Sequence, residues 1–194
     1  HAVLLAALPD TLKAQPLDLS GHSYGGALAL HLARTQKLQI RKLVLFEPVA
    51  FHVLPQLPDA SALWQEVRAL ADALPTLNAI QAAERFIDYW QHKGFFAGLP
   101  VRMQQQLALQ VAKVSLDFQA LSLEPASLAD YADAVKSPVL LLSGSHSRQS
   151  AQRISAALRS VLPDVRLQRL ECGHMGPVTH PDLVNKPIAD FLLV

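Results

Sequence analysis

Strand-length apolar runs and helical hydrophobic spacings alternate at both ends of the chain. The strand-like segments are residues 17–20, 43–46, 137–144 and 165–170. Residues 165–170 alternate strictly between apolar and polar, which is typical of a strand near a sheet edge. Residues 27–33 and 149–162 have the spacing of helices packed against a sheet. Because strands separated by helices pair in parallel, the pattern predicts an α/β fold with a mostly parallel sheet.

Two further helices are predicted at the ends of the chain, and each contains a proline. Residues 3–12 have helical spacing, but Pro9 should end or kink that helix early. Residues 181–194 form the second, in which Pro187 should kink the helix or split off its first turn.

The middle of the chain, residues 51–131, has helical patterns only, separated by proline and glycine. Nine of the twelve aromatic residues lie in it, including both tryptophans. We therefore expect residues 1–50 and 132–194 to form the core and residues 51–131 to form an all-helical cap over the site. A plain helical core is the alternative interpretation, and any single aromatic residue there favours packing over substrate contact.

Composition and charge exclude several classes of protein. The 17 basic and 16 acidic residues give a net charge of +1 without a basic run interleaved with aromatics, so nucleic acid is not an expected partner. No apolar stretch reaches the ~18 residues of a transmembrane helix, so no membrane partner is expected. The single cysteine, Cys172, excludes an internal disulfide and is compatible with a cytoplasmic location. No histidine and carboxylate spacing resembles a ligand set, so we expect neither metal nor cofactor.

A G-x-S-x-G motif, Gly21-His22-Ser23-Tyr24-Gly25, joins the first predicted strand to its helix. This is the pattern of a nucleophile elbow, in which the turn is so tight that a Cβ at Gly21 or Gly25 would collide with neighbouring backbone. Ser23 would then stand at the carboxyl end of the sheet, beside the first N–H groups of a helix. The alternative is a serine that merely caps the helix.

A serine hydroxyl needs a base to take its proton and a third group to orient that base. His174 is the candidate base, because it follows the last strand in a loop that contains Gly173 and Gly176. Glu47 ends the strand after the elbow, so it should lie on the same rim of the sheet as Ser23. Glu171, Asp130 and Asp133 remain alternative acids.

With these motifs the whole chain resembles the α/β-hydrolase family, especially its small serine esterase and perhydrolase-like members with a helical cap. The resemblance implies that Ser23 is the nucleophile, His174 the base and the Tyr24 backbone N–H one donor of the oxyanion hole. The family usually carries its acid a few residues after the penultimate strand, but residues 144–148 contain no carboxylate. Glu47 matches the position that some members use instead.

Family members also have strands before the elbow, and a loop there supplies a second oxyanion donor. The sequence starts too close to the elbow to include them. We therefore expect the chain to be the carboxy-terminal part of a longer hydrolase. A missing amino-terminal segment or an oligomer would then cover the edge of the elbow strand.

The sequence thus predicts a serine hydrolase that cleaves a small to medium apolar acyl ester, its partner being a small-molecule substrate. The expected substrate-binding residues are His22, Trp90, Phe95, Phe96 and Met175. A cofactor-free lyase, perhydrolase or carbon–carbon hydrolase on the same fold is one alternative. A non-catalytic ligand-binding fragment or pseudoenzyme is another.

Overall fold

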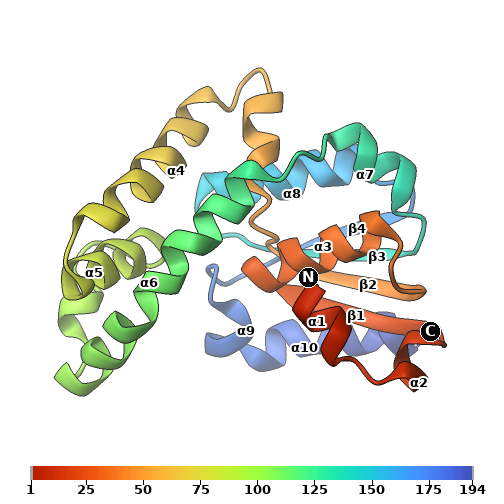
Figure 1. Ribbon diagram of the computed structural model, residues 1–194, viewed down its shortest axis with the longest axis horizontal. Helices are drawn as coiled ribbons and strands as arrows, with labels where there is room; N and C mark the ends of the chain where they lie inside the picture. Colours follow the sequence, from red (N-terminus) through yellow and green to blue (C-terminus); the bar gives the residue numbers. More distant parts are fainter. Residues whose placement is uncertain (1, 194) are drawn as a thin grey trace.

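The computed structural model describes residues 2–193 and contains one four-stranded sheet (Figure 1). Its strands are β1 (Leu17–His22), β2 (Ile40–Phe46), β3 (Val139–Gly144) and β4 (Val165–Leu170). Their order is β1-β2-β3-β4, and every neighbouring pair is parallel. The predicted α/β fold with a parallel sheet is confirmed. β1 and β4 are the edge strands of the sheet that these residues form.

Helices cover both faces of the sheet, because successive side chains of the central strands point to opposite sides. Leu43, Leu45 and Leu141 belong to a core that includes α3 (Tyr24–Thr35) and α8 (Gln149–Val161). The alternate residues of β2 and β3 pack on α10 (Pro181–Leu193) around Val184. The short α9 (Gly176–Thr179) precedes α10.

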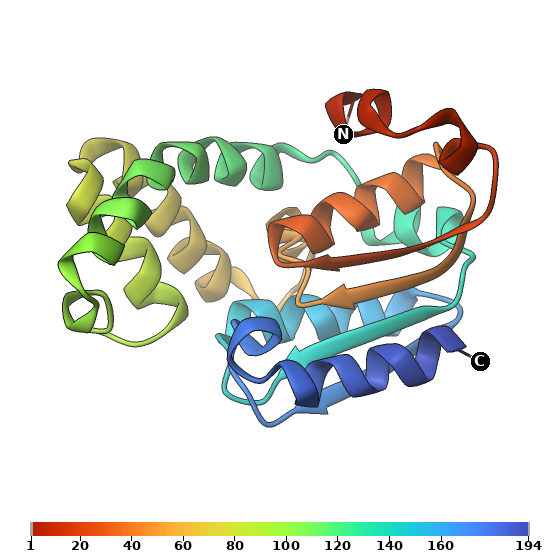
Figure 2. The same ribbon diagram turned by 90° about the horizontal axis from the view of Figure 1, so that it is seen from below.

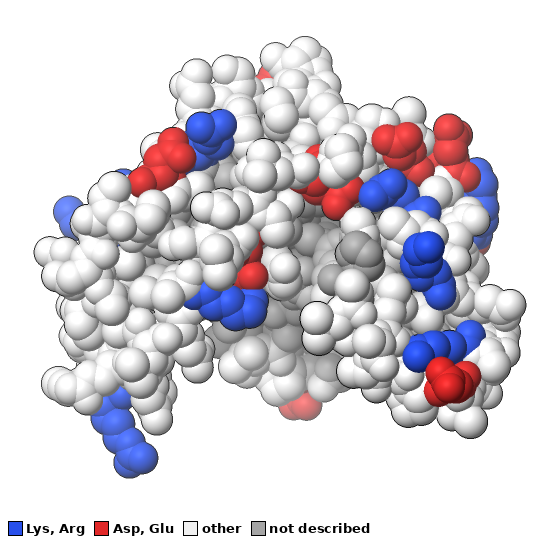
Figure 3. All heavy atoms as spheres, in the orientation of Figure 1, with Lys and Arg blue, Asp and Glu red and all other residues white. Residues whose placement is uncertain are grey.

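The segment between β2 and β3 is helical, and most of it projects beyond the carboxyl ends of the strands (Figure 2). Its elements are η1 (Phe51–Gln56), α4 (Ser61–Ala73), η2 (Leu74–Thr76), α5 (Ala79–Trp90), η3 (Phe96–Gly98), α6 (Val101–Leu123) and α7 (Leu128–Ala134). α7 contacts α3 and α8, so it belongs to the layer that covers the sheet. The face in Figure 3 is hollowed between the projecting helices and the sheet layer, and charges of both signs are interspersed on it.

The two prolines near the ends of the chain behave differently. Pro9 separates α1 (Ala2–Ala7) from α2 (Asp10–Lys13), as predicted. Pro187 does not split off the first turn of α10, which runs as one helix from residue 181 to 193. The carbonyl that Pro187 leaves without a helical donor belongs to the exposed Leu183. Within residues 2–193, no helix is long and apolar enough to cross a membrane.

Candidate active site

Ser23 lies in the turn between β1 and α3, with a backbone φ of 54° and ψ of −122°. Its N–H donates to the carbonyl of Phe46 on the neighbouring strand, at 3.0 Å. A Cβ at Gly21 would lie 2.3 Å from the carbonyl oxygen of Gly25, so only glycine fits there. Because a positive φ is costly for serine, the turn holds Ser23 in a strained position typical of functional sites.

The second glycine of the motif does not act as predicted. A Cβ at Gly25 would meet no atom within 4 Å, so no collision reserves that position for glycine. The close approach occurs one residue later, where a Cβ on Gly26 would lie 3.1 Å from both the Gly21 carbonyl oxygen and the Cα of Pro48. The helix therefore meets the neighbouring strand end at Gly26, on the buried side of α3.

Three predicted site residues form one hydrogen-bonded chain. The Oγ of Ser23 lies 2.9 Å from Nε2 of His174, and Nδ1 of His174 lies 2.7 Å from Oε2 of Glu47. Glu47 is fully buried and His174 is 2% exposed. Since a carboxylate only accepts, Nδ1 carries the proton and Nε2 faces the hydroxyl as an acceptor. This arrangement allows the imidazole to take the proton of Ser23.

The other carboxylate oxygen of Glu47 is held by β3. Oε1 accepts hydrogen bonds from the Ser143 hydroxyl at 3.0 Å and from the Gly144 N–H at 2.8 Å. Glu47 itself has a φ of 44°, and its N–H donates to the Leu142 carbonyl. The sequence reading missed Ser143, although a polar residue at the end of the apolar run Val139–Leu142 was a usable signal.

The alternative acids lie elsewhere. Glu171 has an 81% exposed side chain and contacts His146 at 3.4 Å. Asp130 caps α7, where its carboxylate accepts from the N–H and hydroxyl of Ser127, and Asp133 is exposed. The structure brings Glu47, not these three residues, to the imidazole of His174.

Two rings lie next to the imidazole of His174. The indole of Trp90, the last residue of α5, is stacked on it with 3.7 Å between ring centroids and 17° between planes. The ring of His22 is 5.0 Å away, and its Nε2–H donates to the His174 backbone carbonyl at 2.8 Å. Burial, helped by the nearby His174, lowers the pKa of His22 to about 4. His22 is therefore neutral at pH 7 and supports the loop that carries His174.

The remaining predicted substrate contacts are engaged in packing. The ring of Phe95 lies edge-on to His92 at 5.4 Å, and Phe96 is buried in the main core with its N–H bonded to Asp88. Met175 follows His174 and is half-buried, and its carbonyl accepts hydrogen bonds from α9. For these residues, contact with a substrate stays a prediction.

The end of α5 is hydrogen-bonded to Arg148, just before α8, and to Ser150, in the first turn of α8. Sequence reasoning also missed these contacts. The Tyr89 hydroxyl lies 2.9 Å from the Ser150 hydroxyl. Arg148 donates to the Tyr89 backbone carbonyl and places its guanidinium 4.5 Å from the centre of the Tyr89 ring. A second bond from Arg148 reaches Glu66 on α4 at 3.2 Å. Trp90 therefore follows directly after Tyr89, which is held by its hydroxyl, its carbonyl and its ring.

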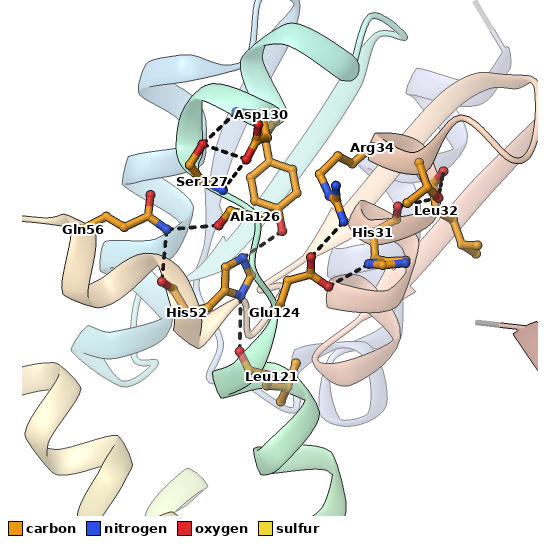
Figure 4. Close-up of polar contacts among 12 residues, drawn as sticks. His31, Leu32, Arg34, His52, Gln56, Leu121, Glu124, Ala126, Ser127 and Asp130 are labelled. Atoms are coloured by element: carbon orange, nitrogen blue, oxygen red, sulfur yellow. Dashed lines mark hydrogen bonds and ion pairs between the residues drawn. The ribbon is translucent and has the colours of Figure 1, made fainter.

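A polar cluster ties the two ends of the helical segment to α3 (Figure 4). His52 of η1 bonds to the Tyr131 hydroxyl at 2.8 Å and to the Leu121 carbonyl at 3.2 Å. Glu124 binds both His31 and Arg34 of α3. All of these residues except Arg34 line a cavity of about 140 Å³. Burial lowers the pKa of His52, so that it stays neutral. Among the described residues, no three histidine, cysteine or acidic side chains are placed to share a metal ion.

Known proteins include relatives of this chain in sequence. A Bacillus subtilis (strain 168) protein is 28% identical to this chain over 204 residues, which are 97% of this chain and 70% of the relative. It is provisionally named a 2-succinyl-6-hydroxy-2,4-cyclohexadiene-1-carboxylate synthase. Lipase LipV of Mycobacterium tuberculosis is 48% identical over 44 residues, which are 23% of this chain and 17% of the lipase.

Solved structures share the fold. The enol-lactonase from Burkholderia xenovorans LB400 superposes with a TM-score of 0.70 and 21% identity, over 95% of this chain and 68% of the lactonase. The model of the family described as "Alpha/beta hydrolase family" matches residues 1–186. The protein therefore belongs to the alpha/beta hydrolase family.

Proposed function

We propose that this protein is a serine hydrolase that cleaves esters with a small to medium apolar acyl group through an acyl-enzyme on Ser23. The observation that carries the proposal is the chain of hydrogen bonds from Ser23 through His174 to Glu47, at 2.9 and 2.7 Å. A hydrolytic role is supported by family membership and by relatives named as lipase and lactonase.

In the first half of the reaction, Ser23 Oγ attacks the ester carbonyl carbon while Nε2 of His174 takes the hydroxyl proton. The tetrahedral intermediate then breaks its bond to the alcohol oxygen, which receives that proton and leaves. Glu47 holds Nδ1–H throughout and stabilises the imidazolium that exists between the two transfers. The acyl group remains on Ser23 Oγ.

In the second half, water attacks the acyl carbon and gives its proton to Nε2 of His174. Collapse of the second intermediate returns the proton to Ser23 Oγ and releases the acid. No other proton acceptor is needed, because the same imidazole acts as base and then as acid in each half.

The developing oxyanion needs hydrogen-bond donors at the elbow. Tyr24 is the first residue of α3, so its N–H has no acceptor within the helix and lies at the positive end of the helix dipole. We assign one donor of the oxyanion hole to this N–H. Such a donor contributes about 3 kcal/mol to transition-state stabilisation.

We assign the role of a cap to residues 51–131. Apart from α7, the longer helices of this segment lie beyond the carboxyl ends of the strands (Figure 2), and Ser23 and Glu47 follow β1 and β2 at those ends. The segment also contains Trp90, whose indole is stacked on the imidazole of His174. An apolar, aromatic cover would exclude water and favour an apolar substrate.

A second candidate is chemistry in which Ser23 and His174 move protons without a covalent acyl intermediate. It is favoured by the Bacillus subtilis relative, which covers 97% of this chain and is named as a synthase. An acyl adduct trapped on Ser23 with a slowly hydrolysed ester would count against this candidate.

A serine-directed fluorophosphonate, followed by intact mass and peptide mapping, tests the proposal. We expect labelling at Ser23 and turnover of p-nitrophenyl butyrate, both abolished by Ser23→Ala. Ser20→Ala is the matched control, because Ser20 lies on β1, the strand that leads to Ser23, and is exposed. Undiminished turnover in the Ser23→Ala variant would refute the assignment, and a folded protein that is never labelled would indicate a non-catalytic binding role.

A further inference from the structure

A cavity of about 680 Å³ lies in the projecting helical segment. It is bounded by α4 and α5, which η2 joins into a hairpin (Figure 1), and by Arg148, which precedes α8. Ser23, His174 and Glu47 do not line it, so it is separate from the proposed active site. Its volume is within the range of roughly 300–1,000 Å³ that is typical of small-molecule sites.

The cavity has an apolar end beside η2. Leu77 follows directly after η2, and Leu70 lies one helical turn before it. Leu70 is 3% exposed and belongs to the main hydrophobic core, and the half-buried Leu77 packs against that core. The two side chains are therefore fixed by their packing, and they offer a preformed apolar surface to a ligand.

The charged side chains of the cavity come from one face of each helix, because they recur at three- and four-residue spacing. Three are acidic and three are basic: Glu66, Glu84, Asp88, Arg85, Lys93 and Arg148. Two of the carboxylates already have partners. Asp88 accepts hydrogen bonds from the N–H groups of Gly94 at 2.6 Å and Phe96 at 2.9 Å, and Glu66 binds Arg148 at 3.2 Å.

The cations of the cavity are less engaged than the acids. Within residues 2–193, the side chains of Arg85 and Lys93 make no ion pair or hydrogen bond. Arg148 uses Nε for the Tyr89 carbonyl and Nη1 for Glu66, so Nη2 can donate to another acceptor. Among the same residues, Glu84 is the one lining carboxylate without a partner. The charge that is available to a ligand is therefore positive.

We propose that this cavity binds apolar monocarboxylates. Arg85, Lys93 and Arg148 would hold the carboxylate, because hydrogen bonds between ionised groups are among the strongest in proteins. The hydrocarbon chain would lie against Leu70 and Leu77, and each methylene that is fully buried there strengthens binding about fourfold. The inference does not rest on the proposed ester hydrolysis.

The test is a titration of the protein with octanoate, followed by the amide signals of a two-dimensional NMR spectrum. The shifts should centre on α4 and α5. Acetate, which lacks the chain, and trimethyl(octyl)ammonium, which has the opposite charge, should each bind at least about tenfold more weakly. Equal or tighter binding of the ammonium ion would overturn the inference. So would shifts centred on Gly21–Gly26, or no shift at about 10 mM octanoate.

A pair of variants shows whether the two unpaired cations hold the carboxylate. Arg85→Gln combined with Lys93→Gln should weaken octanoate binding about tenfold, and the fold should be kept because both residues are exposed. Lys37→Gln combined with Arg159→Gln is the matched control, because it removes the same charge from exposed positions that do not line the cavity. It should stay within about twofold of the parent.

An unchanged affinity in the first pair would overturn the inference. An equal loss in both pairs would overturn it as well, because octanoate would then respond only to the net charge of the protein. The titration needs no turnover, so its outcome is independent of whether Ser23 is labelled by a fluorophosphonate.

Discussion

Replacing Glu47 with glutamine tests whether this carboxylate orients the base. Oε1 accepts from the Ser143 hydroxyl and the Gly144 N–H, so the amide oxygen of the glutamine must take this place. The amide nitrogen then faces Nδ1 of His174, 2.7 Å from the present Oε2. Because that nitrogen only donates, Nδ1 must become the acceptor and the ring proton must move to Nε2. The imidazole can then no longer accept the proton of Ser23.

The size of the effect follows from what is lost. The wrong tautomer removes general-base catalysis, and the missing charge removes the stabilisation of the imidazolium. We expect kcat/KM to fall by about 10³–10⁴, which corresponds to about 4–5 kcal/mol of transition-state stabilisation. The fold should be kept, because the glutamine retains both bonds from β3 and makes the third, to Nδ1, with donor and acceptor exchanged.

The assay is hydrolysis of p-nitrophenyl butyrate at pH 7, with the rate of fluorophosphonate labelling as a second readout. Glu171→Gln is the control, because Glu171 is exposed and was the alternative acid nearest to His174 in the sequence. It should stay within about twofold of the parent. The reasoning would be refuted by a Glu47→Gln variant within tenfold of the parent, or by an equal loss in Glu171→Gln.

Two further predictions concern stability. Gly21→Ala should lower the free energy of unfolding, measured in urea, by more than about 3 kcal/mol, because the new Cβ would lie 2.3 Å from the Gly25 carbonyl oxygen. Gly25→Ala should lower it by no more than about 1 kcal/mol, because a Cβ there meets no atom. Similar values for the two variants would contradict the geometry of the elbow. Burial lowers the pKa of His22 from 6.5 to about 4, so the unfolded chain binds the proton more tightly than the folded protein. The contribution of neutral His22 to the free energy of unfolding is therefore complete above pH 6.5 and is lost as the pH falls towards 4. Between pH 7.5 and 4.5 the parent should lose about 2 kcal/mol more of its free energy of unfolding than His22→Gln, with solvent screening taken into account, and equal losses would contradict this prediction.

The sequence was sufficient to predict the parallel sheet and the edge of it at which the candidate site residues lie. A strand, a buried helix and a second strand can pair in parallel in one way, so Ser23 and Glu47 had to follow neighbouring strands at the same edge. The absence of a carboxylate from residues 144–148 then directed attention to Glu47. The distances from His174 to Ser23 and Glu47 depend on loop conformation, which no pattern of residue types specifies.

Other features depend on how helices pack. Nine aromatic residues lie in residues 51–131, and nothing in their spacing distinguishes Trp90, which stacks on His174, from Phe96, which is buried in the core. The contacts of Tyr89 with Ser150 and Arg148 hold the end of α5, and with it Trp90, in this position. Likewise, the tight contact of the elbow helix falls at Gly26 and not at Gly25, because α3 approaches the Cα of Pro48 there.

The hydrogen bonds of the sheet explain why two residues of the site keep a strained backbone. Ser23 and Glu47 both have positive φ angles, which cost about 1–2 kcal/mol for residues with a Cβ. Each nevertheless extends the parallel ladder by one bond before it turns: the Ser23 N–H donates to Phe46, and the Glu47 N–H to Leu142.

Glu47 thus turns directly beside the end of β3, where Ser143 and Gly144 hold one carboxylate oxygen and leave the other for His174. The bonds that set this geometry come from three adjacent strands and the His174 loop. The order β1-β2-β3 therefore fixes the relative positions of Ser23 and Glu47 without the helical segment, and Trp90 stacks on an imidazole whose two nitrogens are already hydrogen-bonded.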